Sequence, residues 1–294
     1  MKAAPFDYVL AQNIEETTKF LADGNGDAFV LAGGQTLMPM LAMRLARPSI
    51  LIDINSITEL SGIEETNEEI TIKACTRQAD AISSPVIQKR LPLLAYALTF
   101  VGHSQTRNRG TIGGSLAHAD PASEIPLVAL TMNAEISLRS FTSSRRVSAA
   151  EFFLGPMMTT REPTELLASL HFPLSEEGTL VGTGFHEMSE RHGDFALVAV
   201  ATRVELDKQG TCLDAAVAFG GVDDTPVRIE QLENKLRARV IDETAMEIAL
   251  SEIYDRISPV TDQHATADYR KRIAVVLARR AILDAVKAAK RNAA

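Results

Sequence analysis

The N-terminal part of the chain combines one helical pattern with two continuous apolar runs. Residues 13–23 (NIEETTKFLAD) carry apolar or β-branched side chains three to four positions apart, behind Asn13 and with a glutamate three residues after it. This pattern predicts a helix with an asparagine N-cap. Residues 27–34 (DAFVLAGG) and 49–57 (SILIDINSI) are short apolar runs, which predict buried strands.

The middle of the chain mixes strands and helices without strict alternation. Residues 62–75 predict two strands around a polar Glu-Thr-Asn-Glu turn, and residues 91–102 predict a helix with one apolar face. A short helix over 124–132 and strands over 134–140 and 165–173 follow. This order favours an α+β fold over a sheet of parallel βαβ units.

The pattern changes beyond Pro173. Residues 175–184 (SEEGTLVGTG) have the composition of a connector, so we expect a domain boundary near residue 177. Residues 242–257 and 265–290 predict helices. Three apolar segments predict an antiparallel sheet: 182–189, 196–206 and 213–222.

The composition is that of a folded globular chain. The 294 residues are 46% hydrophobic and 23% charged, which suits two or three domains. Charges interrupt every apolar stretch before the roughly twenty residues that a membrane span requires. The N-terminus lacks the apolar core of a secretory signal. We therefore expect a cytoplasmic protein with no membrane span.

Charge and cysteine content argue against two classes of protein. The net charge is −8, and the lysines and arginines form only short, separate groups, which argues against nucleic-acid binding. The chain has two cysteines, Cys75 and Cys212, whereas an iron–sulfur cluster usually takes four thiolates. We therefore expect no cluster in this chain and no structural disulfide.

Two glycine pairs are the main candidates for a binding site. Gly33 and Gly34 lie in LAGGQTLMPM, and Gly113 and Gly114 lie in RNRGTIGGSLAHADPASE. Because glycine has no Cβ, the backbone can turn through φ > 0 and present N–H groups closely to one anion. An ordinary tight turn explains either pair more simply when it is taken alone. Neither pair has the GxGxxG spacing of a dinucleotide-binding βαβ unit or the lysine of a phosphate loop.

The longer segments around these glycines carry a resemblance. They are RPSILIDI, PLLAYALTFVGHSQTRNRGTIGGSLAHADPASE, EFFLGP and RHGDFALVAV. Together with AGGQTLMP, they make nearly the whole chain similar to the FAD-binding medium subunit or domain of molybdenum hydroxylases. This family includes carbon monoxide dehydrogenase, xanthine dehydrogenase and N-heterocycle hydroxylases.

The resemblance implies a two-domain fold. Residues 1–177 would form an FAD-binding domain of the vanillyl-alcohol-oxidase or PCMH type, with α+β subdomains at roughly 1–55 and 56–177. Residues 178–294 would form a C-terminal domain of the carbon monoxide dehydrogenase flavoprotein type, with an antiparallel sheet and helices.

The resemblance also implies which residues contact noncovalently bound FAD. Two loops would hold its diphosphate through backbone donors and hydroxyl groups, and other positions would lie beside the cofactor. The loop residues are Leu31, Ala32, Gly33, Gly34, Gln35, Thr36, Leu37, Met38, Thr111, Ile112, Gly113, Gly114 and Ser115. The other positions are Val101, Ser104, Asp120, Glu124, Leu167, His186 and Phe195.

Some of these positions depart from the family pattern or have a second interpretation. Ser115 stands where the family frequently has asparagine, and His186 stands where the animal enzymes have lysine. Asp120 before Pro121 is also a good N-cap for a helix. Phe195 could cover one face of the isoalloxazine ring or could be an ordinary core residue.

No catalytic residue and no metal site is predicted. Residues 118–124 (HADPASE) hold three titratable groups but lack a recognisable spacing of metal ligands. The chain has no GxSxG or HExxH motif, and His103, His192 and His264 are isolated in the sequence. This pattern fits an electron carrier whose chemistry belongs to its flavin.

The leading hypothesis is an FAD-binding subunit that relays electrons. By resemblance, molybdopterin would sit in a large partner subunit and two [2Fe–2S] clusters in a small one, and FAD in this chain would pass electrons to an external acceptor. The expected assembly is a dimer of heterotrimers. Two alternatives remain: a self-sufficient flavin oxidoreductase of the same FAD-binding fold, and a non-catalytic assembly subunit.

Overall fold

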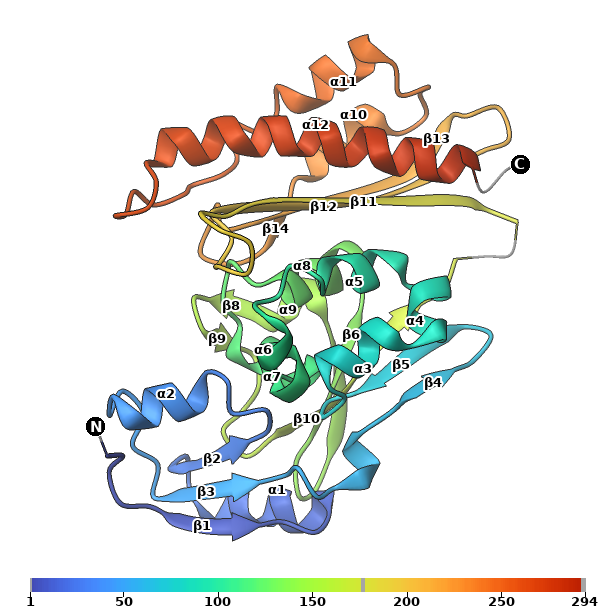
Figure 1. The fold of residues 1–294 in the computed structure, drawn as a ribbon. Coiled ribbons are helices and arrows are strands. Elements are labelled where there is room, and N and C mark those ends of the chain that lie inside the picture. Colours follow the sequence, from blue (N-terminus) through green and yellow to red (C-terminus); the bar gives the residue numbers. More distant parts are fainter. Residues whose placement is uncertain (1, 176–177, 292–294) are drawn as a thin grey trace.

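A computed structural model describes residues 2–175 and 178–291. The described residues form three larger sheets, with helices between and over them, and one two-stranded sheet (Figure 1). The expected domain boundary near residue 177 lies outside the described residues. Within the described part, no helix is both long and apolar enough to cross a membrane.

The first sheet is small and parallel. Its strands are β1 (Asp7–Leu10), β2 (Ala28–Leu31) and β3 (Ile50–Asp53), in the order β1-β3-β2. The connecting helices are α1 (Ile14–Asp23) and α2 (Leu37–Ala42). The predicted asparagine cap of α1 is confirmed, because Asn13 Oδ1 accepts from the Glu16 N–H at 2.8 Å. Neither β1 nor α2 was predicted; β1 has only four residues and is largely exposed.

The second sheet is antiparallel and carries the largest core. Its strand order is β4 (Ile63–Glu65), β5 (Glu69–Lys73), β10 (Leu166–Pro173), β6 (Glu135–Arg139) and β7 (Ser144–Ser148). Apolar side chains on one face pack against α4 (Pro85–Arg90), α5 (Pro92–Ala97) and α8 (Glu124–Thr131). The helix predicted over 91–102 is therefore too long, because α5 ends at Ala97. The remaining short elements are η1 (Thr58–Leu60), α3 (Gln78–Ser83), α6 (Ser104–Arg109), α7 (Ile112–His118), α9 (Ala149–Phe152), β8 (Phe153–Gly155) and β9 (Met158–Thr159).

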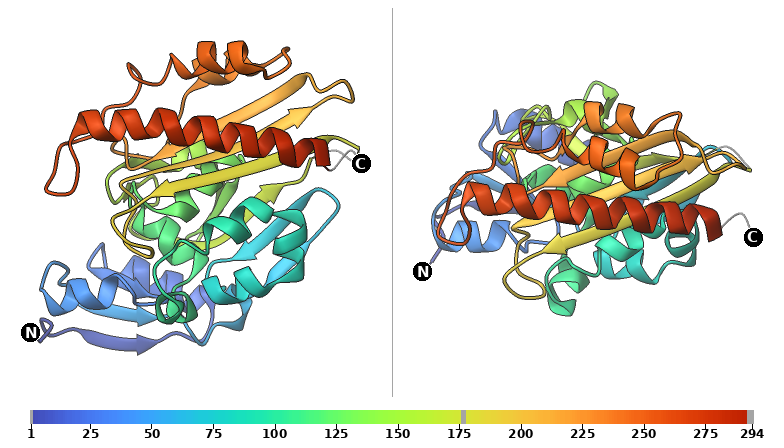
Figure 2. Two further views of the ribbon diagram at one scale, coloured as in Figure 1. Left: turned by 45° about the horizontal axis from the view of Figure 1, so that its top comes forward. Right: turned by 90° about the horizontal axis from the view of Figure 1, so that it is seen from above.

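The third sheet is antiparallel, as predicted. It consists of β11 (Leu180–Met188), β12 (Val198–Leu206), β13 (Cys212–Gly220) and β14 (Val227–Arg228). The long helix α12 (Ala267–Arg291) lies across one face, and Figure 2 shows this cover from above. The other face of the sheet packs on the helices of the second sheet. The short helix α10 (Glu230–Leu236) joins α12 in covering the sheet.

Two predictions for this part of the chain were wrong at their ends. The connector predicted over 175–184 stops earlier, because β11 begins at Leu180. The helix predicted over 242–257 is α11 (Glu243–Leu250), after which the chain turns and buries Ile253 and Ile257 from irregular backbone. The spacing of the apolar residues suits a helix, but turns after Leu250 bury the same side chains, so the spacing alone could not locate the end of the helix.

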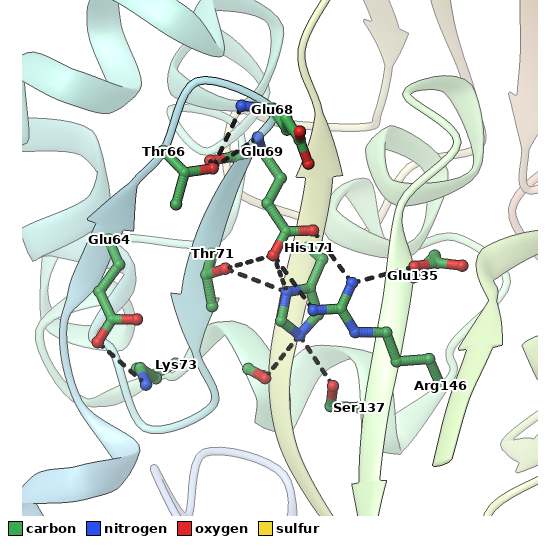
Figure 3. Close-up of polar contacts among 11 residues, drawn as sticks. Glu64, Thr66, Glu68, Glu69, Thr71, Lys73, Glu135, Ser137, Arg146 and His171 are labelled. Carbon is green, nitrogen blue, oxygen red and sulfur yellow. Dashed lines mark hydrogen bonds and ion pairs between the residues drawn. The ribbon is translucent and has the colours of Figure 1, made fainter.

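The other face of the second sheet is held by a polar network around His171 (Figure 3). The His171 Nδ1 atom lies 3.0 Å from Glu69 Oε1, and Nε2 lies 2.8 Å from Ser137 Oγ. With Glu69 ionised, Nδ1 carries the proton and Nε2 accepts from the serine. Arg146 joins Glu69 to Glu135 across the strands. The network therefore cross-links four neighbouring strands, β5, β10, β6 and β7.

We predict that His171→Leu destabilises the fold by about 1–3 kcal/mol, because it removes the hydrogen bonds of the imidazole to Glu69 and Ser137 at a buried position. Burial lowers the pKa of His171 below its ordinary value of 6.5, so the wild type should lose part of its stability as the pH falls below that value. The variant should lack this acid-dependent component. Urea unfolding on both sides of this pH measures both effects, and equal pH dependence of the two proteins would contradict the prediction.

Candidate functional site

The first glycine pair lies between β2 and α2 and touches the segment before the second pair. A Cβ placed on Gly33 would lie 2.4 Å from the Arg109 carbonyl oxygen and 2.9 Å from the Gly110 Cα. Only glycine permits this approach without a shift of backbone. Gly34 has φ of +71°, a conformation that glycine adopts at little cost. The structure thus brings together two segments that are far apart in the sequence.

The first loop leaves backbone donors open. The N–H groups of Gly34, Gln35 and Thr36 donate to no acceptor among the residues that the structure describes. Of these three residues, Gly34 and Gln35 line a surface cavity of about 430 Å³. The cavity is lined by Leu31, Ala32, Gly33, Gly34, Gln35, Met38, Pro39, Asp53, Asn55 and Arg109.

Three polar residues of this cavity were not predicted. Asp53 and Asn55 follow the carboxyl end of β3, and Arg109 ends α6. Sequence signals for the first two existed, because ligands of open parallel sheets bind outside the carboxyl ends of the strands. The Arg109 guanidinium forms no hydrogen bond within the described residues, so its donors are available to a ligand.

Hydrogen bonds fix the polar wall of the cavity. Asn55 Nδ2 donates to Asp53 Oδ1 at 2.6 Å and to the Ala32 carbonyl at 2.8 Å. Tyr8 donates to Asp53 Oδ2 at 2.8 Å. Burial raises the pKa of Asp53, but the bonds from Asn55 and Tyr8 and the charge of Arg109 outweigh it and hold this pKa below its ordinary value. The cavity therefore presents a fixed carboxylate beside a free cation.

The second glycine pair is built differently from the first. Gly113 and Gly114 lie in the first turn of α7. The N–H groups of Gly113 and Gly114 already donate, to the Ala74 carbonyl at 2.8 Å and to Thr111 Oγ1 at 3.1 Å. A Cβ on Gly113 would lie 2.5 Å from Ala74 Cβ, so this glycine allows α7 to approach the end of β5. In this structure the second pair positions α7, and the open donors belong to the first loop.

Four other residues implied by the resemblance lie around α6, α7 and β10. Val101 packs on the core of the second sheet, and Ser104 is exposed at the start of α6. The Ser115 hydroxyl lies 3.0 Å from that of Ser123. Leu167 is a core residue of β10. Leu167 and two neighbours of the second glycine pair, Ile112 and Leu116, therefore belong to one hydrophobic core.

Asp120 does not cap the helix that its sequence suggests. Its Oδ1 accepts from the Ala122 N–H at 2.9 Å, which closes a turn, and α8 begins later, at Glu124. The interpretation of Asp120 as the N-cap of a helix starting at Pro121 is therefore wrong. The turn brings Glu124 into a buried position, 6% exposed.

Phe195 is 72% exposed, so its interpretation as a core residue is wrong. It lies in the connection between β11 and β12, which packs on the segment before α6. There the His192 ring stacks on Phe100, with ring centroids 6.0 Å apart, and Gly193 adjoins the His103 ring. An exposed aromatic ring on an anchored loop is available to a flat ligand.

His186 is not brought toward the glycine loops. It lies on β11 and its Nε2 is 2.9 Å from Asp284 Oδ2 on α12. Successive strand residues point to opposite faces, so His186 faces α12 while Phe185 faces the second sheet. The apolar pattern predicted the strand, and the resemblance implied a position beside the cofactor for His186, which stays a prediction.

Comparisons with known proteins agree with this fold. Residues 4–175 match the family described as the FAD binding domain in molybdopterin dehydrogenase, and residues 183–285 match the CO dehydrogenase flavoprotein C-terminal domain. The chain belongs to this family of FAD-binding medium chains of molybdenum hydroxylases, which are oxidoreductase subunits.

The similarity extends over the full length of relatives. The chain is 37% identical to the 6-hydroxypseudooxynicotine dehydrogenase complex subunit alpha of Paenarthrobacter nicotinovorans, covering 99% of this chain and 97% of that one. It is 35% identical to the glyceraldehyde dehydrogenase medium chain of Sulfolobus acidocaldarius, over 95% and 98%. A solved structure of carbon monoxide dehydrogenase from Hydrogenophaga pseudoflava superposes with a TM-score of 0.94 at 34% identity, over 98% and 99%.

We predict that Gly33→Ala destabilises the protein by about 1–3 kcal/mol, because the new methyl group overlaps the Arg109 carbonyl and forces the two segments apart. Gly155→Ala is the matched control, since the closest atom to its added Cβ is 3.8 Å away. Urea unfolding of the two variants gives the comparison. An equal loss of unfolding free energy in both variants would contradict the prediction, because the contact of Gly33 with the Arg109 carbonyl would then contribute nothing specific to stability.

Proposed function

We propose that this chain binds FAD noncovalently through the first glycine loop and Arg109, and that it relays electrons within a molybdenum hydroxylase complex. One observation carries the binding proposal: Gly34 and Gln35, whose N–H groups are open, line the same cavity as Arg109, whose guanidinium is unpaired in the described residues. Such donors suit a diphosphate, because backbone N–H groups and arginine both form strong hydrogen bonds to phosphate oxygens.

The carboxylate in the cavity favours a nucleotide over a simple anion. Asp53 is held ionised by Tyr8 and Asn55 and can only accept hydrogen bonds. A bare phosphate would be repelled by it, whereas a ligand with hydroxyl groups beside its phosphates can donate to it. The ribose and ribityl hydroxyls of FAD meet this requirement. The residues present therefore fit FAD, which would supply the redox chemistry when bound.

Similarity to subunits of larger dehydrogenases favours an electron relay over a self-sufficient oxidoreductase. Its full-length relatives are named as subunits or medium chains of dehydrogenases. We propose that electrons enter from [2Fe–2S] clusters in a small partner subunit and that molybdopterin lies in a large one. An external acceptor would take the electrons from the flavin. We expect a dimer of heterotrimers in the cytoplasm, and the two free, buried cysteines agree with a reducing compartment.

We predict that the chain copurifies with two other subunits and that the complex contains molybdenum, iron and FAD. Metal analysis and the flavin absorption spectrum of the purified complex measure this. FAD alone, with substrate turnover by the isolated chain, would instead support the self-sufficient oxidoreductase. A colourless chain that takes up no FAD would contradict both functions.

We predict that Arg109→Gln weakens FAD binding about tenfold or more, because a charged hydrogen bond to a phosphate is lost. Arg239→Gln is the matched control: it removes the same charge from an exposed position of the C-terminal part. Flavin fluorescence during titration of the FAD-free chain gives both dissociation constants. Equal affinity of the two variants would remove Arg109 from the proposed site.

A further inference from the structure

Arg77 joins two segments that line the candidate cavity, although it is not among the lining residues itself. It lies between β5 and α3 and is half-buried. Its Nη1 atom donates to the Arg109 carbonyl at 2.5 Å, and its Nη2 atom donates to Asn55 Oδ1 at 2.6 Å. A planar guanidinium can hold two acceptors in fixed directions at once. One side chain therefore ties the loop after β3 to the end of α6.

The backbone around Arg77 is fixed against the segment that leads into α7. Arg77 and Thr111 form an antiparallel bridge, and the Gln78 N–H donates to the Gly110 carbonyl at 2.9 Å. The guanidinium thus extends from backbone that is itself hydrogen-bonded. Such support limits the positions that a side chain can reach, so its two acceptors are held at defined points.

The bond from Arg77 decides how the Asn55 amide is oriented. A guanidinium has only donors, so it requires the amide oxygen on its side. The amide nitrogen then faces two acceptors, Asp53 Oδ1 at 2.6 Å and the Ala32 carbonyl at 2.8 Å. In the reverse orientation the nitrogen would face the guanidinium and the oxygen would face the carboxylate, so donor would meet donor and acceptor would meet acceptor. Through Asn55, Arg77 therefore fixes the polar wall of the cavity.

The Arg109 backbone is held at the same point by a second contact. The carbonyl oxygen that accepts from Arg77 also lies next to Gly33, because a Cβ placed on Gly33 would be 2.4 Å from it. The Arg109 guanidinium, in contrast, lines the cavity and is unpaired in the described residues. Because the backbone of Arg109 is held, its side chain reaches the cavity from a fixed origin.

The charge of Arg77 is not neutralised by a carboxylate. Both of its acceptors are uncharged, and within residues 2–175 and 178–291 it forms no ion pair. Its charge alone would also favour an anion in the cavity. Positioning and charge differ in one consequence: lysine preserves the charge, but its compact ammonium on a flexible stem does not hold two acceptors in a fixed geometry.

We propose that Arg77 is a positioning residue of the diphosphate site, which holds the Asn55 amide and the Arg109 backbone in the arrangement that binds a nucleotide diphosphate. The ligand contacts come from the Arg109 guanidinium and from the open N–H groups of the first glycine loop. This inference rests on the proposed function, because FAD is the nucleotide that the site would bind. It adds a residue that neither the glycine pairs nor the resemblance indicated.

A double-mutant cycle tests whether Arg77 acts through Arg109. We expect Arg77→Gln to weaken FAD binding about tenfold, comparable to Arg109→Gln. The double variant should bind at most about threefold more weakly than Arg109→Gln alone, because a guanidinium that is absent cannot be positioned. Independent effects would multiply to about a hundredfold. Flavin fluorescence during titration of the FAD-free chains gives all four dissociation constants.

Two further variants separate positioning from charge and from general destabilisation. Arg77→Lys should recover only part of the lost affinity, and it takes the place of Arg77→Gln in the cycle if that variant does not fold. Arg161→Gln is the matched control, since Arg161 is also half-buried and its Nη1 donates to two carbonyls, of Glu162 at 2.9 Å and Glu165 at 2.7 Å. It should leave the affinity for FAD unchanged. Urea unfolding of each FAD-free variant verifies that it is folded.

Titration with ADP separates this inference from the proposed function, because ADP carries a diphosphate and ribose hydroxyls but no flavin. Calorimetry with the FAD-free chains should show the same non-additive loss of affinity for the two arginine substitutions. A wild type that binds ADP with this coupling but takes up no FAD would refute the proposed function and leave the role of Arg77 established.

Four results would overturn the inference. The first is a multiplicative effect of Arg77→Gln and Arg109→Gln on the dissociation constant. The second is full recovery of affinity in Arg77→Lys, which would assign the effect to charge alone. The third is an equal loss of affinity in Arg161→Gln, which would assign it to general destabilisation. The fourth is a wild type that binds neither FAD nor ADP, which would overturn the inference together with the proposed function.

Discussion

The close approach of Gly33 to the Arg109–Gly110 backbone is the contact on which the proposed binding site depends. It joins the first, parallel sheet to the segment that enters α7. The atoms nearest to Gly33 are backbone atoms, so a larger residue at this position could not be accommodated by a side-chain rotation in its neighbour. The Arg77 guanidinium reinforces it by donating both to the Arg109 carbonyl and to Asn55. The open N–H groups, the fixed carboxylate and the free guanidinium of the cavity keep their relative positions only while these segments remain in contact.

The sequence predicted the parts of the fold in which local signals and tertiary packing agree. The Asn13 cap and the antiparallel sheet after residue 180 are examples, since capping chemistry and apolar runs are properties of short segments. It missed β1, whose side chains are mostly exposed and whose stability comes from pairing with β3. It overextended the helix beyond Leu250, because Ile253 and Ile257 are buried from turns at a spacing that also suits a helix.

The sequence predicted where the candidate site lies, but it did not predict all of its polar residues. The resemblance identified the first glycine loop, and the structure places that loop at a cavity. It did not indicate Asp53, Asn55 or Arg109, because their significance depends on the parallel pairing of β3 and on the contact between distant loops. The two glycine pairs look alike in the sequence, yet the N–H groups of Gly113 and Gly114 are already bonded. The hydrogen bonds therefore distinguish the two pairs: the first loop has open N–H groups, and those of the second pair are bonded within the chain.

His186 and Glu187 also illustrate how much depends on the three-dimensional structure, because they lie on opposite faces of β11. They are neighbours in the sequence. In a strand, however, one residue is the difference between two faces. His186 reaches Asp284 on α12, where its ring is partly exposed and paired. Glu187 lies on the opposite face, which packs on the helices of the second sheet, and its buried carboxyl oxygens have no hydrogen-bond partner in the described residues. The electrostatic character of the contact between the flavin-binding part and the C-terminal sheet is therefore set by register. A shift of the β11–β12 pairing by one residue would replace a buried acid with a histidine.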